Sequence, residues 1–149
     1  LFDAVSALIG ECRESCFEAE APMRLEALTK PGIEGIYPFE FSQQAIISFQ
    51  STFHAIVEDL EKGISRGEIA TKFHNTVALS ILLGARSIRK NHNINKVALS
   101  GGTFQNKYLT EKTIEMLEKE HFEVYVNRLV PANDGGISLG QLAIAAHKK

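Results

Sequence analysis

The sequence predicts a helix-rich α/β fold with a short parallel sheet, and three observations favour it. Two long stretches, 42–62 and 66–90, carry apolar residues at helical spacing. Two short apolar runs, Val97–Leu99 and Val124–Val126, have the composition of strands. Between them, residues 106–120 again show helical periodicity. A strand, a helix and a strand with so short a return form a right-handed parallel crossover unit.

The first forty residues predict shorter elements. A helix is expected over residues 1–10, ending at Gly10. A second helix should have Pro22 in its first turn, shortly after Glu18 and Glu20. We expect Ile36–Phe39 to form a short edge strand, because Pro38 cannot donate to a sheet ladder.

The longer helices follow. Ser42 is predicted to cap the helix that runs to Gly63. The helix over 66–90 is apolar nearly all round, which indicates burial. The last helix is expected to open at 133–136 and to reach Ala146.

Composition excludes several functional classes. The chain has 149 residues, 44% of them hydrophobic, and a net charge of −2, which predicts one domain over 1–149 and no nucleic-acid partner. No apolar run is long enough to cross a membrane. Cys12 and Cys16 have neither the spacing nor the second pair of a zinc site, so we expect reduced thiols in a cytoplasmic protein.

Two features indicate a piece of something longer. The chain begins at Leu1, inside an apolar helical pattern. Two parallel strands also leave both sheet edges unpaired, and such a sheet is not stable alone. Either further strands lie upstream or the edges pair with another chain, for example in a homodimer.

The crossover unit also predicts where a ligand binds. Parallel strands leave a sheet at the same edge, so the loop containing Gly101 and Gly102 should lie beside the loop at 132–136. Each loop leads to a helix N-terminus, where free N–H groups favour an anion or a nucleotide phosphate. Glycines allow a close approach to the backbone, and Asp134 is the carboxylate at this edge.

Two glycine-containing motifs carry a family resemblance. The motif at 100–106, SGGTFQN, followed by VPANDGGISLGQ at 130–141, resembles the C-terminal end of HypF-type carbamoyltransferases, maturation factors of [NiFe] hydrogenases. Residues 1–5, 18–26 and 73–76 are similar to the same family. The resemblance covers essentially the whole chain in order.

The resemblance implies both a fold and an activity. The family's last domain has the actin/hexokinase/Hsp70-like (ribonuclease H-like) ATPase fold, and it is related to the tRNA threonylcarbamoyl transferases. With ATP and carbamoyl phosphate it forms carbamoyl-adenylate, then passes the carbamoyl group to the C-terminal cysteine of HypE, on the way to the cyanide ligands of the hydrogenase iron. This chain resembles only the later part of that domain.

The resemblance also assigns roles to residues of this sequence. Gly101, Gly102 and Asn106 would hold the nucleotide, and Asp134 would bind a divalent metal, Mg or Fe/Zn. The segments containing Glu18, Glu20 and His74 would border the nucleotide and carbamoyl pocket. His74 would then be catalytic, as a donor to a carbamoyl or phosphate oxygen.

The residues by themselves leave structural alternatives open. The two glycines could form only a tight turn. Asp134 and Asn106 could be N-caps, and Glu18 and Glu20 first-turn charges. His74 could be a core histidine with satisfied hydrogen bonds. A non-catalytic nucleotide-binding or assembly module is accordingly the alternative to an enzyme, and a threonylcarbamoyl transferase is the alternative enzyme.

Overall fold

A computed structural model describes residues 1–42 and 46–147 of the chain. Its elements are α1 (Phe2–Leu8), α2 (Glu20–Ala27), β1 (Glu40–Phe41), β2 (Ile47–Ser48), α3 (Gln50–Glu61), α4 (Arg66–His92), β3 (Lys96–Leu99), α5 (Lys107–Lys119), β4 (Glu123–Val126) and α6 (Ile137–His147), with 3₁₀ turns η1 (Gly102–Gln105) and η2 (Asp134–Gly136). The predicted helix-rich α/β class with a short parallel sheet is confirmed.

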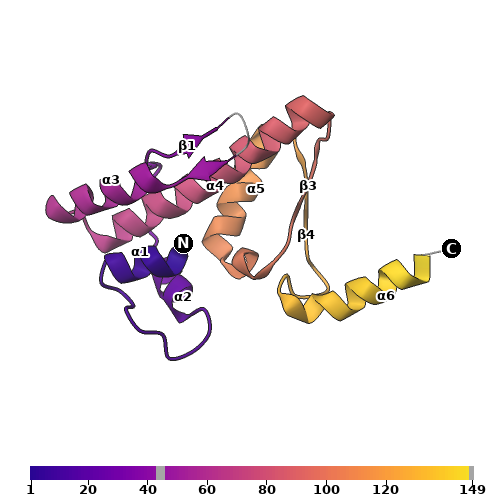
Figure 1. Cartoon of the computed structure of the whole chain (residues 1–149), viewed down its shortest axis with the longest axis horizontal. Coiled ribbons are helices and arrows are strands. Elements are labelled where there is room, and N and C mark those ends of the chain that lie inside the picture. Colours follow the sequence, from indigo (N-terminus) through magenta and orange to yellow (C-terminus); the bar gives the residue numbers. More distant parts are fainter. Residues whose placement is uncertain (43–45, 148–149) are drawn as a thin grey trace.

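The long helix α4 runs diagonally through the molecule and contributes to two hydrophobic cores (Figure 1). Its first half packs Phe73 and Ala78 against α1, α2, α3 and α5. Its second half packs Leu82 and Ala85 against the β3–β4 sheet and α5. This confirms the expectation of a buried helix over 66–90.

Both ends of α4 have local causes. Ser65 is the N-cap, and its hydroxyl accepts a hydrogen bond from the N–H of Glu68 at 3.2 Å. At the other end Asn93 takes the left-handed conformation, with φ of 54°, and its N–H donates to the carbonyl of Arg89.

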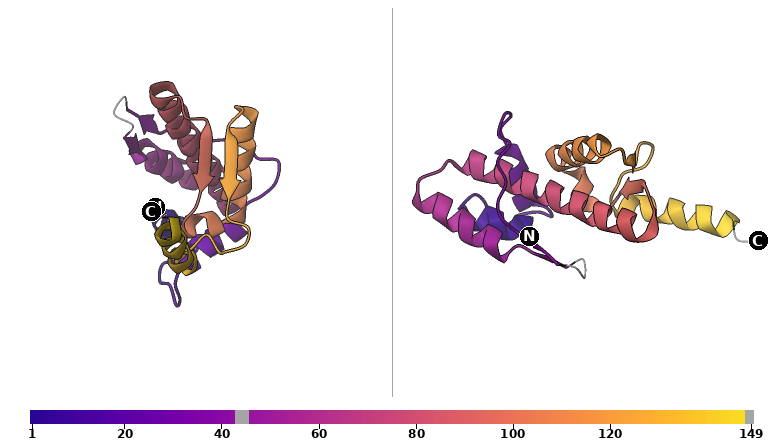
Figure 2. Two further views of the ribbon diagram at one scale, coloured as in Figure 1. Left: turned by 90° about the vertical axis from the view of Figure 1, so that its right-hand side faces the viewer. Right: turned by 90° about the horizontal axis from the view of Figure 1, so that it is seen from above.

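The crossover unit is present as predicted. Strands β3 and β4 are parallel, with Lys96 opposite Glu123 and Leu99 opposite Val126. They lie side by side, and α5 connects them (Figure 2). Among the described residues no third strand joins this sheet, so both of its edges are unpaired.

A hairpin replaces two expected elements. The edge strand predicted at Ile36–Phe39 is wrong: β1 starts at Glu40 and pairs antiparallel with β2. Ser42 is not the N-cap of α3, which is Phe49; the hydroxyl of Ser42 accepts a hydrogen bond from the N–H of Ile46. Residues 43–45 of the expected helix lie outside the described residues, and α3 begins only at Gln50. The spacing of apolar residues could not distinguish a strand from a helix here, because Ile46 and Phe49 fit the periodicity of both.

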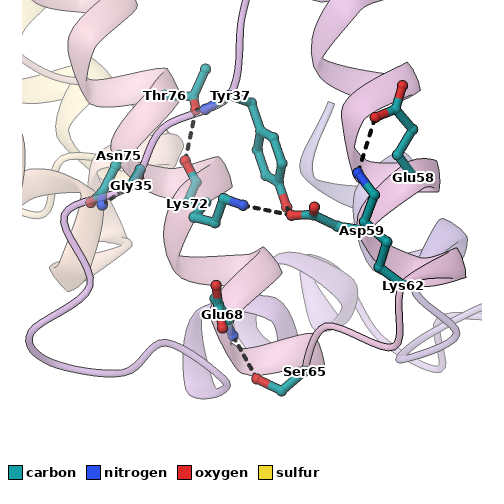
Figure 3. Close-up of polar contacts among 10 residues, drawn as sticks. All are labelled: Gly35, Tyr37, Glu58, Asp59, Lys62, Ser65, Glu68, Lys72, Asn75 and Thr76. Atoms are coloured by element: carbon teal, nitrogen blue, oxygen red, sulfur yellow. Dashed lines mark hydrogen bonds and ion pairs between the residues drawn. The ribbon is translucent and has the colours of Figure 1, made fainter.

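A polar cluster fastens the segment before this hairpin to the helices (Figure 3). The N–H of Tyr37 donates to Thr76 Oγ1 at 2.7 Å, and its hydroxyl donates to Asp59 Oδ2 at 2.8 Å. Lys72 Nζ lies 2.6 Å from the same oxygen and 4.6 Å from the centre of the Tyr37 ring. Burial raises the pKa of Tyr37, and Asp59 raises it further. The cluster joins α3, α4 and this segment.

Helix α6 extends away from the rest of the molecule (Figures 1 and 2). It contains no buried residue, and Leu142 and Ile144 are 68% and 63% exposed. In the described part of the chain, no helix is both long and apolar enough to cross a membrane.

Candidate functional site

The two glycine-containing loops meet at one rim of the sheet, as predicted. The N–H of Gly101, just after β3, donates a hydrogen bond of 2.8 Å to the carbonyl of Ala132, in the loop after β4. Both loops lie at the lower end of the strands in Figure 1, where α6 begins. We call the segments 100–102 and 130–137 the rim.

The glycines of the rim differ in why a side chain would be unfavourable at each position. Gly101 has φ of 103°, a conformation that side chains rarely adopt. A Cβ at Gly136 would lie 3.0 Å from the carbonyl oxygen of Pro131, so a side chain would push the turn apart. Gly102 has neither constraint, and a Cβ there would face open space. The fold alone therefore does not explain Gly102.

A hollow of about 520 Å³ opens at the rim, between the two loops and the start of α6. Asp134 lines it and is exposed, and its carboxylate makes no hydrogen bond or ion pair with the described residues. The alternative role of Asp134 as the N-cap is wrong, because Asn133 is the cap and its side-chain oxygen accepts from the N–H of Gly135. The carboxylate is therefore free to meet a ligand.

The donor set at the rim fits a metal only in part. Within 1–42 and 46–147 no group of three His, Cys, Asp or Glu residues is placed to hold an ion. One exposed carboxylate suits a hard cation such as Mg²⁺ that takes its remaining ligands from phosphates and water. It does not suit a closed Zn or Fe cage. The metal role of Asp134 stays a prediction.

The N–H groups at the N-terminus of α5 already have acceptors within the protein, which corrects one expectation. Glu26 Oε1 accepts from the N–H groups of Lys107 at 2.7 Å and Tyr108 at 3.1 Å. Asn106 Oδ1 accepts from Leu109 N at 2.8 Å, which confirms its predicted capping role. The expectation of free N–H groups at both helices is wrong for α5, because a carboxylate of α2 already occupies the place of an anion.

His74 is a core histidine with both ring nitrogens engaged. Its side chain is fully buried, its Nδ1 lies 2.7 Å from the carbonyl oxygen of Ala70, and its Nε2 lies 2.9 Å from Asn106 Nδ2. A carbonyl only accepts, so Nδ1 carries the proton and Nε2 accepts from the amide. The structural alternative is confirmed. The direct catalytic role stays a prediction, and this geometry leaves His74 no free donor for it.

Burial lowers the pKa of His74, and the hydrogen bond to Ala70 and the charge of Glu26 only partly oppose this. The ring also meets aromatic neighbours: the centroids of Phe2 and Tyr108 lie 5.2 and 5.5 Å away, both edge to face. The imidazole is consequently neutral and tightly held.

Glu20 and Glu18 have different surroundings. Glu20 is buried; it accepts from the N–H of Cys16 and pairs with Arg24 at 2.7 Å. The Cys16 hydrogen bond, opposed by desolvation and helped by Arg24, holds the pKa of Glu20 below its ordinary value. Glu18 is exposed in the loop before α2. Glu20 thus closes that loop, and nucleotide contact by either residue stays a prediction.

Asn75, next to His74 in the 73–76 motif, joins three segments through hydrogen bonds. Asn75 Nδ2 donates to the carbonyls of Ile33 and Gly35, and Asn75 Oδ1 accepts from the hydroxyl of Tyr108. The sequence reasoning missed Tyr108 as a neighbour of this motif, and it missed the bonds from Glu26 to α5, although the 18–26 segment was expected at the pocket. No local signal could have found them, since their partners lie at least 33 positions away.

Comparison with protein families then identifies the chain. The family model described as "Carbamoyltransferase, Kae1-like Domain, second subdomain" matches residues 1–141. The chain belongs to the HypF carbamoyltransferase family. The matched range includes every residue of the rim.

Individual HypF proteins agree with this assignment. The chain is 39% identical to carbamoyltransferase HypF of Synechocystis sp. and 30% identical to a probable carbamoyltransferase HypF of Methanocaldococcus jannaschii. Each alignment covers 95% of the chain but 18% of the relative, so the chain spans less than a fifth of their length. A tRNA N6-adenosine threonylcarbamoyltransferase of Thermosipho africanus is 24% identical over 84% of the chain and 40% of that relative.

Two solved HypF structures share the fold. A full-length HypF crystallised in the phosphate- and nucleotide-bound form superposes with a TM-score of 0.91 at 48% identity, over 97% of this chain and 19% of that one. HypF of T. kodakarensis gives 0.80 at 26% identity, with the same coverage.

Proposed function

We propose that this chain forms the nucleotide-side wall of a carbamoyltransferase site. One observation carries the proposal: in a member of the HypF family, two hydrogen-bonded loops line a hollow with a carboxylate that has no partner among the residues that the structure describes. The ligand would be ATP with a divalent cation, seated between the 100–102 segment and Asp134. The crystallised relative in a phosphate- and nucleotide-bound form supports this choice of ligand.

The rim offers a limited set of chemical roles. Gly102 leaves its backbone open to a phosphate, and Asp134 contributes one ligand to a cation that offsets phosphate charge. The backbone N–H groups of the first turn of α5 do not take part, because Glu26 and Asn106 already accept from them. The remaining cation ligands would come from the nucleotide, water and other parts of a longer polypeptide.

The finer proposal concerns the group transferred. Hydrolysis of carbamoyl phosphate would release phosphate and carbamate, and attack of the carbamate oxygen on the α-phosphate of ATP would release pyrophosphate and give carbamoyl-adenylate. The C-terminal cysteine thiolate of a HypE-like acceptor would then take the carbamoyl group and release AMP, in the cytoplasm, during cyanide-ligand synthesis for [NiFe] hydrogenases. Family membership supports this reaction class.

Nucleotide-induced stabilisation tests the proposal. The melting temperature of the chain is measured with and without Mg·ATP, and at 100 times Kd we expect a gain of about 2.7 kcal/mol in unfolding free energy. Gly102→Ala should leave the unliganded chain unchanged, because a Cβ there meets no other atom, but it should weaken ATP binding if a phosphate approaches the backbone of Gly102. Asp134→Asn should lose the Mg²⁺-dependent part of the gain.

Gly84→Ala is the matched control. A Cβ at Gly84 would also meet no atom, but Gly84 lies within α4 and does not line the rim hollow. It should keep the full response to ATP. An equal response in wild type, Gly102→Ala and Asp134→Asn would contradict binding at the rim.

A second candidate is a non-catalytic assembly module. The exposed apolar residues of α6 and the unpaired edges of the sheet favour it, since such surfaces are typical of a contact with more protein. Absence of any ATP response in a chain that self-associates would select this candidate. The threonylcarbamoyl transferase alternative rests on the more distant Thermosipho relative.

A further inference from the structure

Asn106 joins a buried histidine to the turn that follows the rim residue Gly102. It follows η1, the turn that begins at Gly102, and its side chain is half-buried. Its Oδ1 accepts from Leu109 N at 2.8 Å, and its Nδ2 donates to His74 Nε2 at 2.9 Å. A primary amide has two Nδ2 hydrogens, and the second has no partner among the described residues.

His74 is built to hold this amide in one orientation. The hydrogen bond from its Nδ1 to Ala70 fixes the tautomer, so Nε2 presents a lone pair and can only accept. Edge-to-face contacts with Phe2, Phe73 and Tyr108 fix the ring plane. The oxygen and nitrogen of a side-chain amide are nearly equal in shape, so the two orientations differ mainly in hydrogen bonding. His74 Nε2 needs a donor and the N–H of Leu109 needs an acceptor, and together they select one orientation of the Asn106 amide.

His74 cannot itself contact a ligand. Its side chain has no exposed surface, and neither ring nitrogen is free. Its hydrogen bond to Asn106 is the contact through which it can act on the turn that follows Gly102.

We propose that His74 is a positioning residue, which fixes the amide of Asn106 so that its second Nδ2 hydrogen is offered to a hydrogen-bond acceptor of the bound adenine nucleotide. The inference rests on the proposed function, because it takes the nucleotide as the ligand. It differs from a catalytic role for His74, since the imidazole neither touches the ligand nor transfers a proton.

A double-mutant cycle on ATP affinity tests the coupling. Calorimetry measures the Kd of Mg·ATP for wild type, His74→Met, Asn106→Ala and the double variant. Met fills the volume of the imidazole without an acceptor, so we expect a Kd about tenfold weaker, in keeping with the loss of one buried hydrogen bond. In the Asn106→Ala background, His74→Met should add nothing.

His74→Gln is the matched rescue variant. The side-chain oxygen of Gln reaches the place of Nε2 and can accept from Asn106, so the Kd should stay within about twofold of wild type. Two single effects that simply multiply in the double variant would overturn the proposal. So would a His74→Gln variant as weak as His74→Met.

A measurement on the wild-type chain needs no variant and no ligand. Nitrogen-15 NMR of the imidazole should show the Nδ1–H tautomer for His74, with both side-chain hydrogens of Asn106 resolved and slow to interchange. The Nε2–H tautomer would overturn the proposal. Wild type that shows the expected tautomer but binds no ATP would overturn the proposed function and this nucleotide role together, whereas ATP binding with a failed cycle would overturn only the role of His74.

Discussion

Buried polar groups of this chain fall into two classes at the scale of single residues. Most have a partner: Thr71, Thr76 and Ser80 each donate to a carbonyl of the preceding helical turn. In the described residues, the hydroxyls of Ser6 and Thr113 are buried without a hydrogen bond. Burying an unpaired hydroxyl carries a free-energy cost, so these are the positions where the fold can be improved.

Thr113→Val should stabilise the chain. Valine keeps the shape and the β-branch but removes the unpaired Oγ1, so we expect the free energy of unfolding to rise by about 1 kcal/mol. Urea denaturation followed by circular dichroism measures it. Thr76→Val is the control, and it should destabilise because Thr76 Oγ1 accepts from the N–H of Tyr37. A loss of stability in Thr113→Val would mean that its hydroxyl has a water partner.

His74 predicts how stability depends on pH. The pKa of His74 in the folded chain lies below the ordinary 6.5. Between these two pKa values the unfolded chain binds a proton at His74 and the folded chain does not. The free energy of unfolding should therefore fall as the pH drops from about 6.5 toward the lowered value, and level off below it. The lowered pKa values of Glu20 and Asp59 act only at more acidic pH.

The measurement is a series of urea midpoints between pH 7.5 and 5. His74→Gln, which does not titrate, should have a flatter profile in this window. Identical slopes for the two proteins would contradict a neutral buried imidazole.

At the scale of elements, α5 depends on a carboxylate 81 positions away in the sequence. Glu26→Gln keeps the shape of the side chain but weakens its bonds to the N–H groups of Lys107 and Tyr108. Loss of the charge at a helix N-terminus should cost about 1 kcal/mol of unfolding free energy, less at high salt. Glu118→Gln, an exposed change near the other end of α5, is the matched control and should cost nothing. Equal effects of the two changes would argue against the capping role.

Elements with strong periodicity could be predicted from the sequence, and the others could not. Helix α4 was predicted because its apolar pattern extends over seven turns, and the crossover unit because two strands flank one clear helix. The hairpin was missed because β1 and β2 have two residues each, too few to show alternation. The capping of α5 by Glu26 was missed because no local pattern encodes a contact between distant segments.

The same limit applies to the candidate site. The meeting of Gly101 with the 132–136 loop follows from parallel strands alone, and it is confirmed. The contact between His74 and Asn106 needs the packing of α4 on α5, which no spacing in the sequence reveals. Asn133 rather than Asp134 became the cap, a difference of one position that propensity cannot resolve.

At the scale of the whole molecule, the exposed surface predicts self-association. The apolar side chains of α6 and the open edges of the sheet leave the chain able to pair with itself. The double variant Leu142→Glu/Ile144→Glu should lower the average mass seen by light scattering at high protein concentration, without loss of stability. Leu129→Glu, at a 99% exposed position before α6, should not. A monomeric wild-type chain at all concentrations would contradict the expectation.

Helix α4 has a mechanical consequence for this molecule. At 27 residues it is about 40 Å long; residues 69–78 pack in one core, and Leu82 and Ala85 pack in the other. A continuous helix that packs in both cores cannot tilt in one of them without also moving in the other. A displacement of α4 where it contacts α1 and α2 would thus move its second half against the β3–β4 sheet as one rigid body, without a hinge.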